Sequence, residues 1–243
     1  MQLPFEQFPA LSAIGICRHV FTQRIPGIDV SHEKVEVLKR LDAAHRQIRK
    51  AIGVDDWPLV TAQQIHGKQI AEVRSALRAN RGRRGAASQP ATEFYGCDGL
   101  ITNQRSVALG IYVADCCAVY IVDPKTPAIG LVHSGRKGTE LGVVTIAIRQ
   151  MMDRFGSDPA NMVVQLSPCI RPPHYEVDFA SEIVRQCRAL GVKEIHDSNV
   201  CTACDLDRYY SYRAEKGKTG RMLALIGLRE GSRATASGQC RAL

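Results

Sequence analysis

The sequence predicts an α+β fold in which mixed β-sheets are covered by helices, forming a single compact domain over residues 1–243. Short apolar runs rich in β-branched residues are mixed with stretches of helical periodicity, without the regular strand and helix alternation of a doubly wound parallel sheet. A chain of 243 residues with 45% apolar content can bury one large core. Since the sequence contains neither an internal repeat nor a long linker, nothing in it demands two domains.

The first helix is expected between Ser31, which can cap it, and Gly53, which would end it. The apolar positions of this helix keep a helical spacing at Val35, Leu38, Leu41, Ile48 and Ile52. From Leu59 to Arg74, β-branched residues flank His66, Gly67 and Lys68, which predicts two short strands joined by a turn or bulge.

Further short apolar runs predict the strands in the middle of the chain. They are separated by polar or turn-forming residues and cover Asp98 to Thr102, Val107 to Val113, Cys117 to Val122 and Ala128 to His133. A second helix is expected from a cap at Thr139 to a stop at Gly156. The apolar face of that helix would consist of Leu141, Val144, Ile148, Met151 and Phe155.

The last third of the chain repeats these patterns. Met162 to Leu166 and Met222 to Leu228 are expected strands, and a third helix is expected to end at Gly191. Its apolar positions are Phe179, Ile183, Val184, Cys187 and Leu190. The polar tail from Arg229 is expected to be flexible.

Composition excludes several classes of protein. Met1 to Ala10 lacks the pattern of an export signal, and Val107 to Val122 is too short and too polar to span a bilayer, so we expect a cytoplasmic protein without a membrane segment. Nine cysteines in such a protein are better explained as core residues, metal ligands or nucleophiles than as disulfides.

The net charge of +8 is weak support for a polyanionic partner, because the excess is spread along the chain. One arginine cluster consists of Arg74, Arg78, Arg81, Arg83 and Arg84. Since no aromatic residues are interleaved with these arginines, a solvated loop is favoured over a nucleic-acid surface. A basic nucleic-acid-binding protein is kept as an alternative, and the sequence does not predict an oligomeric state.

Three segments each end an apolar run in a residue able to bind a metal: His66, Cys116 and His133. A sheet can bring three strand ends together, and glycines shortly after both histidines allow a ligand to approach closely. Two imidazoles and a thiolate suit zinc, and three protein ligands leave an open coordination position, as in catalytic sites. Alternatively, Cys116 is the nucleophile of a metal-independent cysteine hydrolase, paired with His133 or His66.

Neighbouring residues leave other questions open. Cys117 should face away from Cys116, by the two-residue period of a strand. Asp115 could orient a histidine ligand or cap a turn. The Cys201-Thr202-Ala203-Cys204 segment has the spacing of half a structural zinc site, but no second CxxC pair accompanies it.

The strings QIHG, CDGLIT, ADCCAVYIVD, GLVHSGRKG, SPCIRPPHYEVD and YYSYRAEKGKTGR resemble, in order, the blocks of the laccase-domain family. That family was first labelled multicopper polyphenol oxidase and is now regarded as zinc-dependent purine nucleoside phosphorylase with adenosine deaminase activity. The resemblance implies that His66, Cys116 and His133 bind zinc and that Arg24 of the Phe21-Thr22-Gln23-Arg24 block contacts substrate or phosphate. It implies phosphate as co-substrate and adenosine, inosine or methylthioadenosine as the purine nucleoside.

The chain departs from the family pattern beside one of the expected ligands. Where the family usually reads HAGWRG, this sequence has His133-Ser134-Gly135-Arg136-Lys137-Gly138, so Arg136 replaces the tryptophan.

A copper-dependent polyphenol oxidase is the remaining alternative. A laccase-type trinuclear copper cluster resembles a cage of eight histidines arranged in His-X-His pairs. This chain has seven histidines and no such pair, so one chain cannot form that cluster. A single copper ion at the Cys/His site stays open.

Overall fold

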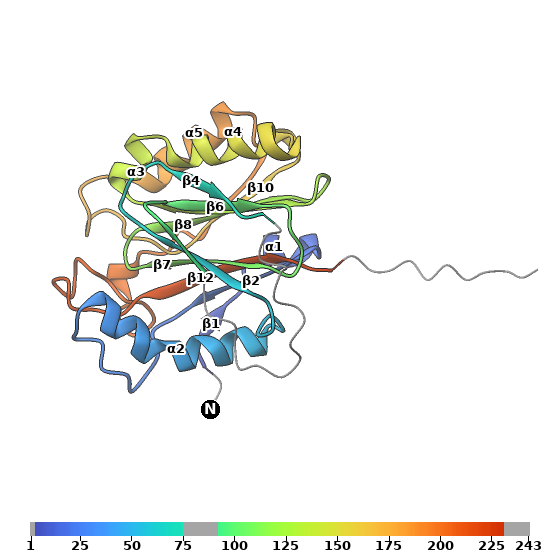
Figure 1. Ribbon diagram of the computed structural model, residues 1–243. Coiled ribbons are helices and arrows are strands. Elements are labelled where there is room, and N and C mark those ends of the chain that lie inside the picture. Colours follow the sequence, from blue (N-terminus) through green and yellow to red (C-terminus); the bar gives the residue numbers. More distant parts are fainter. Residues whose placement is uncertain (1–2, 75–91, 231–243) are drawn as a thin grey trace, which may run out of the picture.

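Two six-stranded β-sheets pack face to face, with helices on both outer faces, in the computed structural model, which describes residues 3–74 and 92–230 (Figure 1). Sheet A has the order β1 (Phe5–Glu6), β2 (Cys17–Thr22), β12 (Met222–Leu228), β7 (Ala108–Val113), β3 (Leu59–Gln63) and β5 (Thr92–Tyr95). Sheet B has the order β11 (Glu194–Asp197), β10 (Val163–Leu166), β8 (Cys117–Asp123), β9 (Ala128–Ser134), β6 (Gly99–Thr102) and β4 (Ile70–Glu72). Both sheets mix parallel and antiparallel pairs, so the predicted α+β class is confirmed.

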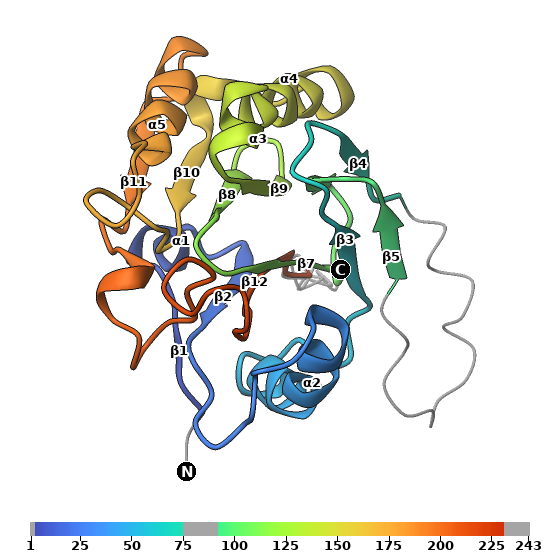
Figure 2. The same ribbon diagram turned by 90° about the vertical axis from the view of Figure 1, so that its left-hand side faces the viewer.

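Helices cover the sandwich on two sides. The outer face of sheet A packs against α2 (Lys34–Ala51), and the outer face of sheet B packs against α4 (Val143–Phe155) and α5 (Phe179–Ala189), with α3 (Arg136–Glu140) beside them (Figures 1 and 2). The short helix α1 (Pro9–Ile14) contacts β2 and β10. Among the described residues, no helix is both long and apolar enough to cross a bilayer.

Strand β8 is buried on both faces, which explains why its sequence is almost continuously apolar. Cys117, Val119 and Ile121 join the core beneath α4 and α5. Ala118, Tyr120 and Val122, which alternate with them, join the core between the sheets. A strand with two buried faces carries no polar alternation.

The predicted start of the first helix is wrong. Helix α2 begins after Glu33, and Ser31 instead donates its hydroxyl to Asp29 Oδ1 at 2.6 Å. Val35, placed in the apolar stripe, is 68% exposed. The stripe that faces sheet A begins at Val37 and contains Ala44 together with the predicted Leu41 and Ile48.

The second predicted helix is divided in two. Gly142 adopts φ 70° and separates α3 from α4, so Thr139 lies inside α3 and does not cap a long helix. The Thr139 hydroxyl donates to the Gly135 carbonyl at 2.9 Å. Leu141, expected in the core, is 41% exposed because it lies at this break. The predicted stop at Gly156 is confirmed.

The two strands expected around His66 exist, but they belong to different sheets. Strand β3 is in sheet A and β4 is in sheet B, so residues 64–69 cross between the sheets. At the other end of the chain, the Arg229 N–H donates to the Ile16 carbonyl at 2.8 Å. The flexible tail expected beyond it falls mostly on residues 231–243, outside the described residues.

Tyr120 links the two sheets, and its hydroxyl is a testable contact. It is fully buried in β8 and donates to the Val20 carbonyl of β2 at 2.8 Å. We expect Tyr120→Phe to lower the free energy of unfolding by about 1 kcal/mol, because the carbonyl loses this donor inside the core. Urea denaturation would measure the change. Tyr95→Phe is the matched control, since Tyr95 is 74% exposed; equal stability of the two variants would contradict the assignment.

Candidate metal centre

His66, Cys116 and His133 meet because the chain crosses twice between the sheets at the same end of the sandwich. β3 and β7 are parallel neighbours in sheet A, so their carboxyl ends lie side by side. His66 is in the crossing after β3 and Cys116 is in the crossing after β7, at the end of the molecule that carries α3 (Figure 1). His133 lies in β9, which pairs with β8 just after the second crossing.

The ligand atoms of these three residues lie within 4.8 Å of one another. The two imidazole rings are nearly perpendicular, at 80°, with centroids 4.8 Å apart. His133 is buried, Cys116 is half-buried and His66 is exposed. The group therefore opens toward solvent on the side of His66.

Asp98 is the carboxylate that orients this group. It is fully buried, and its Oδ1 lies 2.9 Å from Nδ1 of His133, which leaves Nε2 of that ring free to bind a metal. The same carboxylate accepts the backbone N–H groups of His66 at 2.8 Å and Gly67 at 2.7 Å. These bonds hold the crossing segment while His66 adopts a left-handed φ of 58°.

Gly135 explains why a glycine follows the second histidine. A Cβ atom at this position would lie 2.6 Å from Sγ of Cys116, well inside van der Waals contact. The glycine after His66 is also confined, because a Cβ at Gly67 would lie 3.2 Å from Asp98 Oδ2. One glycine therefore makes room for the thiol, and the other makes room for the orienting carboxylate.

Cys116 and His133 shift each other's pKa. Burial raises the pKa of Cys116, but the charge of His133 and hydrogen bonds from His133 and His66 outweigh it and lower the pKa to about 6. Burial lowers the pKa of His133, but the charge of Cys116 and the hydrogen bond to Asp98 raise the pKa to about 9. Each group therefore favours the charged form of the other, and the thiolate is the form of Cys116 that binds metals or attacks carbonyl groups.

The structure confirms the predicted orientation of Cys117 and decides the open question of Asp115. Cys117 faces the core beneath α4 and α5, so it does not share the site with Cys116. Asp115, with φ 81°, accepts the Thr202 hydroxyl at 2.7 Å and the Arg213 N–H at 2.6 Å. It fixes the turn before Cys116, whereas Asp98 orients the histidine; the sequence alone did not single out Asp98.

A cavity of about 830 Å³ opens above the three residues. Its lining includes the aromatic side chains Tyr112, Tyr175, Phe179 and Tyr212. It also includes the basic side chains Lys34, Arg136, Lys137, Arg213 and Arg221. Aromatic rings can stack on a planar base, and cations can hold an anion, so the cavity offers contacts for both kinds of group.

Ion pairs cross the mouth of this cavity. Glu176 lies 3.3 Å from Arg213 and 4.0 Å from Arg136, and Arg136 also pairs with Glu140 at 2.9 Å. Arg136, which stands where the family usually has tryptophan, is therefore tied to carboxylates on two segments.

Arg24 makes other contacts. It pairs with Glu215 at 2.8 Å, donates to the Tyr209 carbonyl and stacks on the Tyr210 ring at 4.5 Å. Glu215 in turn accepts the Ser211 N–H at 3.1 Å, so Arg24 anchors the loop that carries Tyr212 and Arg213 into the cavity. Arg24 itself is not part of the cavity lining, and the substrate contact implied for it stays a prediction.

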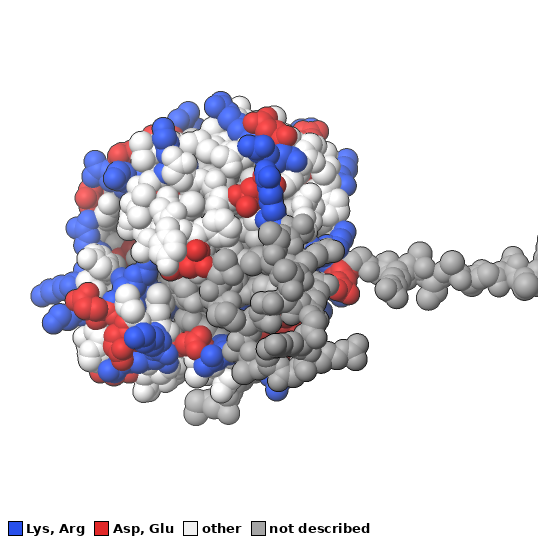
Figure 3. Space-filling view, viewed as in Figure 1, with Lys and Arg blue, Asp and Glu red and all other residues white. Residues whose placement is uncertain are grey.

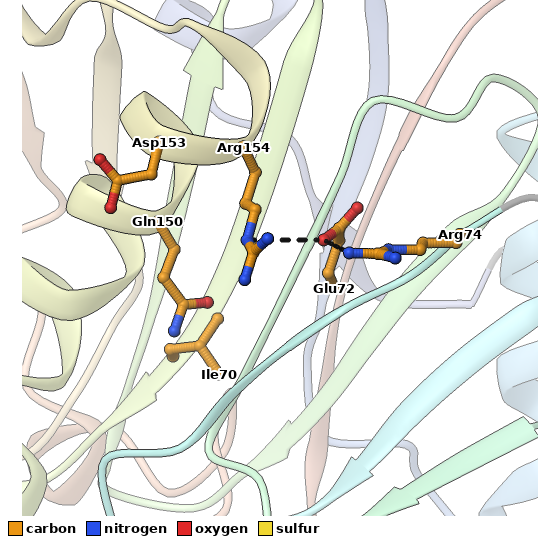
Figure 4. Close-up of a pocket in the computed structure, with 6 residues that line it drawn as sticks. All are labelled: Ile70, Glu72, Arg74, Gln150, Asp153 and Arg154. Atoms are coloured by element: carbon orange, nitrogen blue, oxygen red, sulfur yellow. Dashed lines mark hydrogen bonds and ion pairs between the residues drawn. The ribbon is translucent and has the colours of Figure 1, made fainter.

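A second hollow, of about 480 Å³, lies between β4 and α4 (Figure 4). Glu72 lies there between Arg74, at 2.7 Å, and Arg154, at 3.9 Å. The two groups of potential metal ligands found in the described residues both lie elsewhere. This hollow therefore offers less chemistry than the cavity above Cys116.

The arginine cluster is described only at Arg74. The other members, Arg78, Arg81, Arg83 and Arg84, lie outside the described residues. On the face shown in Figure 3, basic side chains are interspersed with acidic ones and do not gather in one continuous patch. The expectation that nucleic acid is not the partner stays a prediction.

Comparisons with known proteins agree on one family. The family model for the multi-copper polyphenol oxidoreductase laccase matches residues 18–185 and 174–229. A protein of Geobacillus stearothermophilus named purine nucleoside phosphorylase YlmD is 29% identical, over 84% of this chain and 83% of its own length. A Deinococcus radiodurans protein named purine nucleoside phosphorylase is 27% identical, over 99% of this chain and 98% of its own. The crystal structure of YlmD from Geobacillus stearothermophilus superposes with a TM-score of 0.78 at 25% identity, over 94% of this chain and 100% of that one. This chain belongs to the multi-copper polyphenol oxidoreductase laccase family.

Proposed function

We propose that the protein is a zinc-dependent purine nucleoside phosphorylase. The observation that carries this proposal is one cavity in which a His66, Cys116 and His133 group lies beneath aromatic and basic side chains. The names of the curated relatives support the same activity. The finer expectations, that adenosine, inosine and methylthioadenosine are substrates and that adenosine is also deaminated, are part of the proposal.

The residues fit a zinc ion. Two imidazoles and a thiolate match its preferred ligands, the lowered pKa of Cys116 supplies the thiolate, and Gly135 leaves room beside the sulfur. His66, Cys116 and His133 would hold the ion, with Asp98 orienting His133. Bound zinc would supply a Lewis acid with an open coordination position. A single copper ion is the alternative occupant of the same ligands.

The protein's own side chains would bind the two substrates. Phosphorolysis brings a phosphate anion to the sugar carbon while the bond to the base breaks. Lys137 and Arg136 lie on α3 directly after His133, so they are placed to hold an anion near the ligand group. Tyr212 and Tyr175 offer rings on which a purine can stack.

A cysteine hydrolase is the second candidate, and a specific contact favours it. Asp98 bonds Nδ1 of His133 at 2.9 Å, and the other nitrogen of that ring faces the Cys116 group, so thiol, imidazole and carboxylate stand in the order found in nucleophilic hydrolases. The two candidates differ in what they need: the phosphorylase requires metal and phosphate, while the hydrolase requires neither.

Incubation of the purified protein with adenosine tests the proposed function. We expect adenine and ribose 1-phosphate to form only when phosphate is present. We also expect that removal of zinc by a chelator abolishes turnover and that added zinc restores it. Inosine in the products would report deamination. The His66→Ala and Cys116→Ala variants should lose activity together with about one zinc ion per chain. The proposal fails if neither adenine nor inosine appears, and turnover that survives chelation would instead favour the hydrolase.

Replacing Asp98 tests which carboxylate supports the ligands. Asp98→Asn keeps the shape but removes the charge behind His133, so we expect zinc affinity to fall about 10- to 100-fold. Competition with a chromophoric chelator would measure this change. Asp115→Asn is the matched control, because Asp115 is also buried near Cys116 but bonds to Thr202 and Arg213 and to neither histidine. A larger loss in the control than in Asp98→Asn would contradict the assignment.

Lys137 is expected to bind phosphate. Lys137→Gln removes a charge from the cavity and should raise KM for phosphate about 10-fold, equivalent to about 1.4 kcal/mol, while KM for the nucleoside changes little. Steady-state kinetics with each substrate varied in turn would show the difference. Lys125→Gln, in the turn between β8 and β9, is the control. If Lys137→Gln raised both KM values equally, the phosphate-binding cation would be a residue other than Lys137.

A further inference from the structure

A second group of metal-binding side chains lies outside the centre described above. Among the described residues, His174, Cys201 and Cys204 place one ligand atom each within 4.8 Å of one another. The CxxC pair had no partner at the matching spacing in the sequence. The structure adds His174, which is separated from Cys201 by 26 residues and comes from the loop before α5.

The separations fit one tetrahedral ion. With bond lengths of roughly 2.3 Å to sulfur and roughly 2.0 Å to nitrogen, two ligand atoms on a tetrahedral zinc lie roughly 3.5 Å apart for nitrogen and sulfur. Nδ1 of His174 lies 3.4 Å from Sγ of Cys204 and 3.8 Å from Sγ of Cys201. The two sulfur atoms and the ring nitrogen are therefore close enough to bind one ion.

The backbone around the group is held in place without a metal. The backbones of Cys201 and Cys169 form an isolated parallel β-bridge, and the Thr202 N–H donates to the Cys169 carbonyl at 3.2 Å. The short 3-10 helix η3 (Thr202–Cys204) then turns Cys204 back toward Cys201. The two thiols are therefore presented by a fixed turn, and His174 is the member brought to it from another segment.

We propose that His174, Cys201 and Cys204 form a second zinc site, which joins two segments of the chain. Two thiolates and one imidazole are ligands that zinc favours over hard cations. Because His174 and Cys204 are exposed, water can take the fourth position. The ion would fasten the loop before α5 to the turn at η3.

Both fastened segments reach the first centre. Tyr175, the residue after His174, lines the cavity. Thr202, between the two cysteines, donates its hydroxyl to Asp115, the residue before Cys116. The second zinc would thus hold one wall of the cavity and the turn that carries a ligand of the first zinc. It would not touch the reacting groups.

Metal content of the full-length protein, purified with a thiol reductant and supplied with zinc, tests the proposal. We expect two zinc ions per chain in the wild type by native mass spectrometry and elemental analysis. Cys204→Ser and His174→Ala should each keep one ion, and so should Cys116→Ser, while the Cys116→Ser and Cys204→Ser double variant should keep none. His196→Ala is the matched control for His174→Ala, since the side chain of His196 is 42% exposed and hydrogen-bonds only Glu194 among the described residues.

The pattern of loss separates the two sites. Hydrogen exchange in residues 170–178 and 200–205 should become faster in Cys204→Ser, because the loop is no longer fastened, and should stay unchanged in His196→Ala. A wild type that binds only one zinc ion per chain, with that ion retained in Cys204→Ser, would overturn the second site alone. A Cys201 to Cys204 disulfide that persists in reductant, seen as a mass two hydrogens lower, would overturn it as well. Loss of zinc only in Cys204→Ser would contradict the first centre and leave the second standing.

Discussion

The buried carboxylate of Asp98 is the contact on which the geometry of the first centre depends. It has no exposure to solvent, and burial alone would raise its pKa. The hydrogen bond from His133, the charge of that ring and the backbone N–H groups of Gly67 and Ile65 outweigh burial, and the pKa is lowered. The same bonds tie the crossing after β3 to strand β9. Because the buried Asp98 carboxylate needs hydrogen-bond donors, it fixes both the backbone at His66 and the ring of His133.

Much of this arrangement could be predicted from the sequence, for identifiable reasons. Strands such as Cys117–Asp123 can be predicted because they are continuous apolar runs, and the residues at the ends of such runs, His66 and Cys116, are predicted metal ligands on that basis. Helix starts were less predictable, because the break at Gly142 is a left-handed backbone turn with no distinctive side chain. The sequence pointed only to Asp115, the neighbour of Cys116, as a carboxylate that could orient a histidine. The role of Asp98 became visible only in its tertiary contact with His133.

The need for tertiary contacts also explains why the sequence predicts one group of potential metal ligands completely and the other only in part. His66, Cys116 and His133 occur in motifs, so local patterns and family resemblance both point to them. His174 lies in an irregular loop, and only the packing of that loop against the turn at η3 brings it to Cys201 and Cys204. A search for spacing motifs finds CxxC pairs but cannot find a distant histidine that completes them.

The ion pairs at the cavity mouth have a consequence for access. Glu176 is shared by Arg136 on α3 and Arg213 on the loop after Tyr212, and all three side chains are about half exposed or more. Such exposed pairs hold two segments together weakly, and concentrated salt weakens them further, because the Debye length falls from about 8 Å at physiological ionic strength to about 3 Å at 1 M. Salt would also compete with an anionic ligand for the freed arginines. The entrance would thus respond to ionic strength in two opposing ways, widening as the segments separate while its attraction for anions declines.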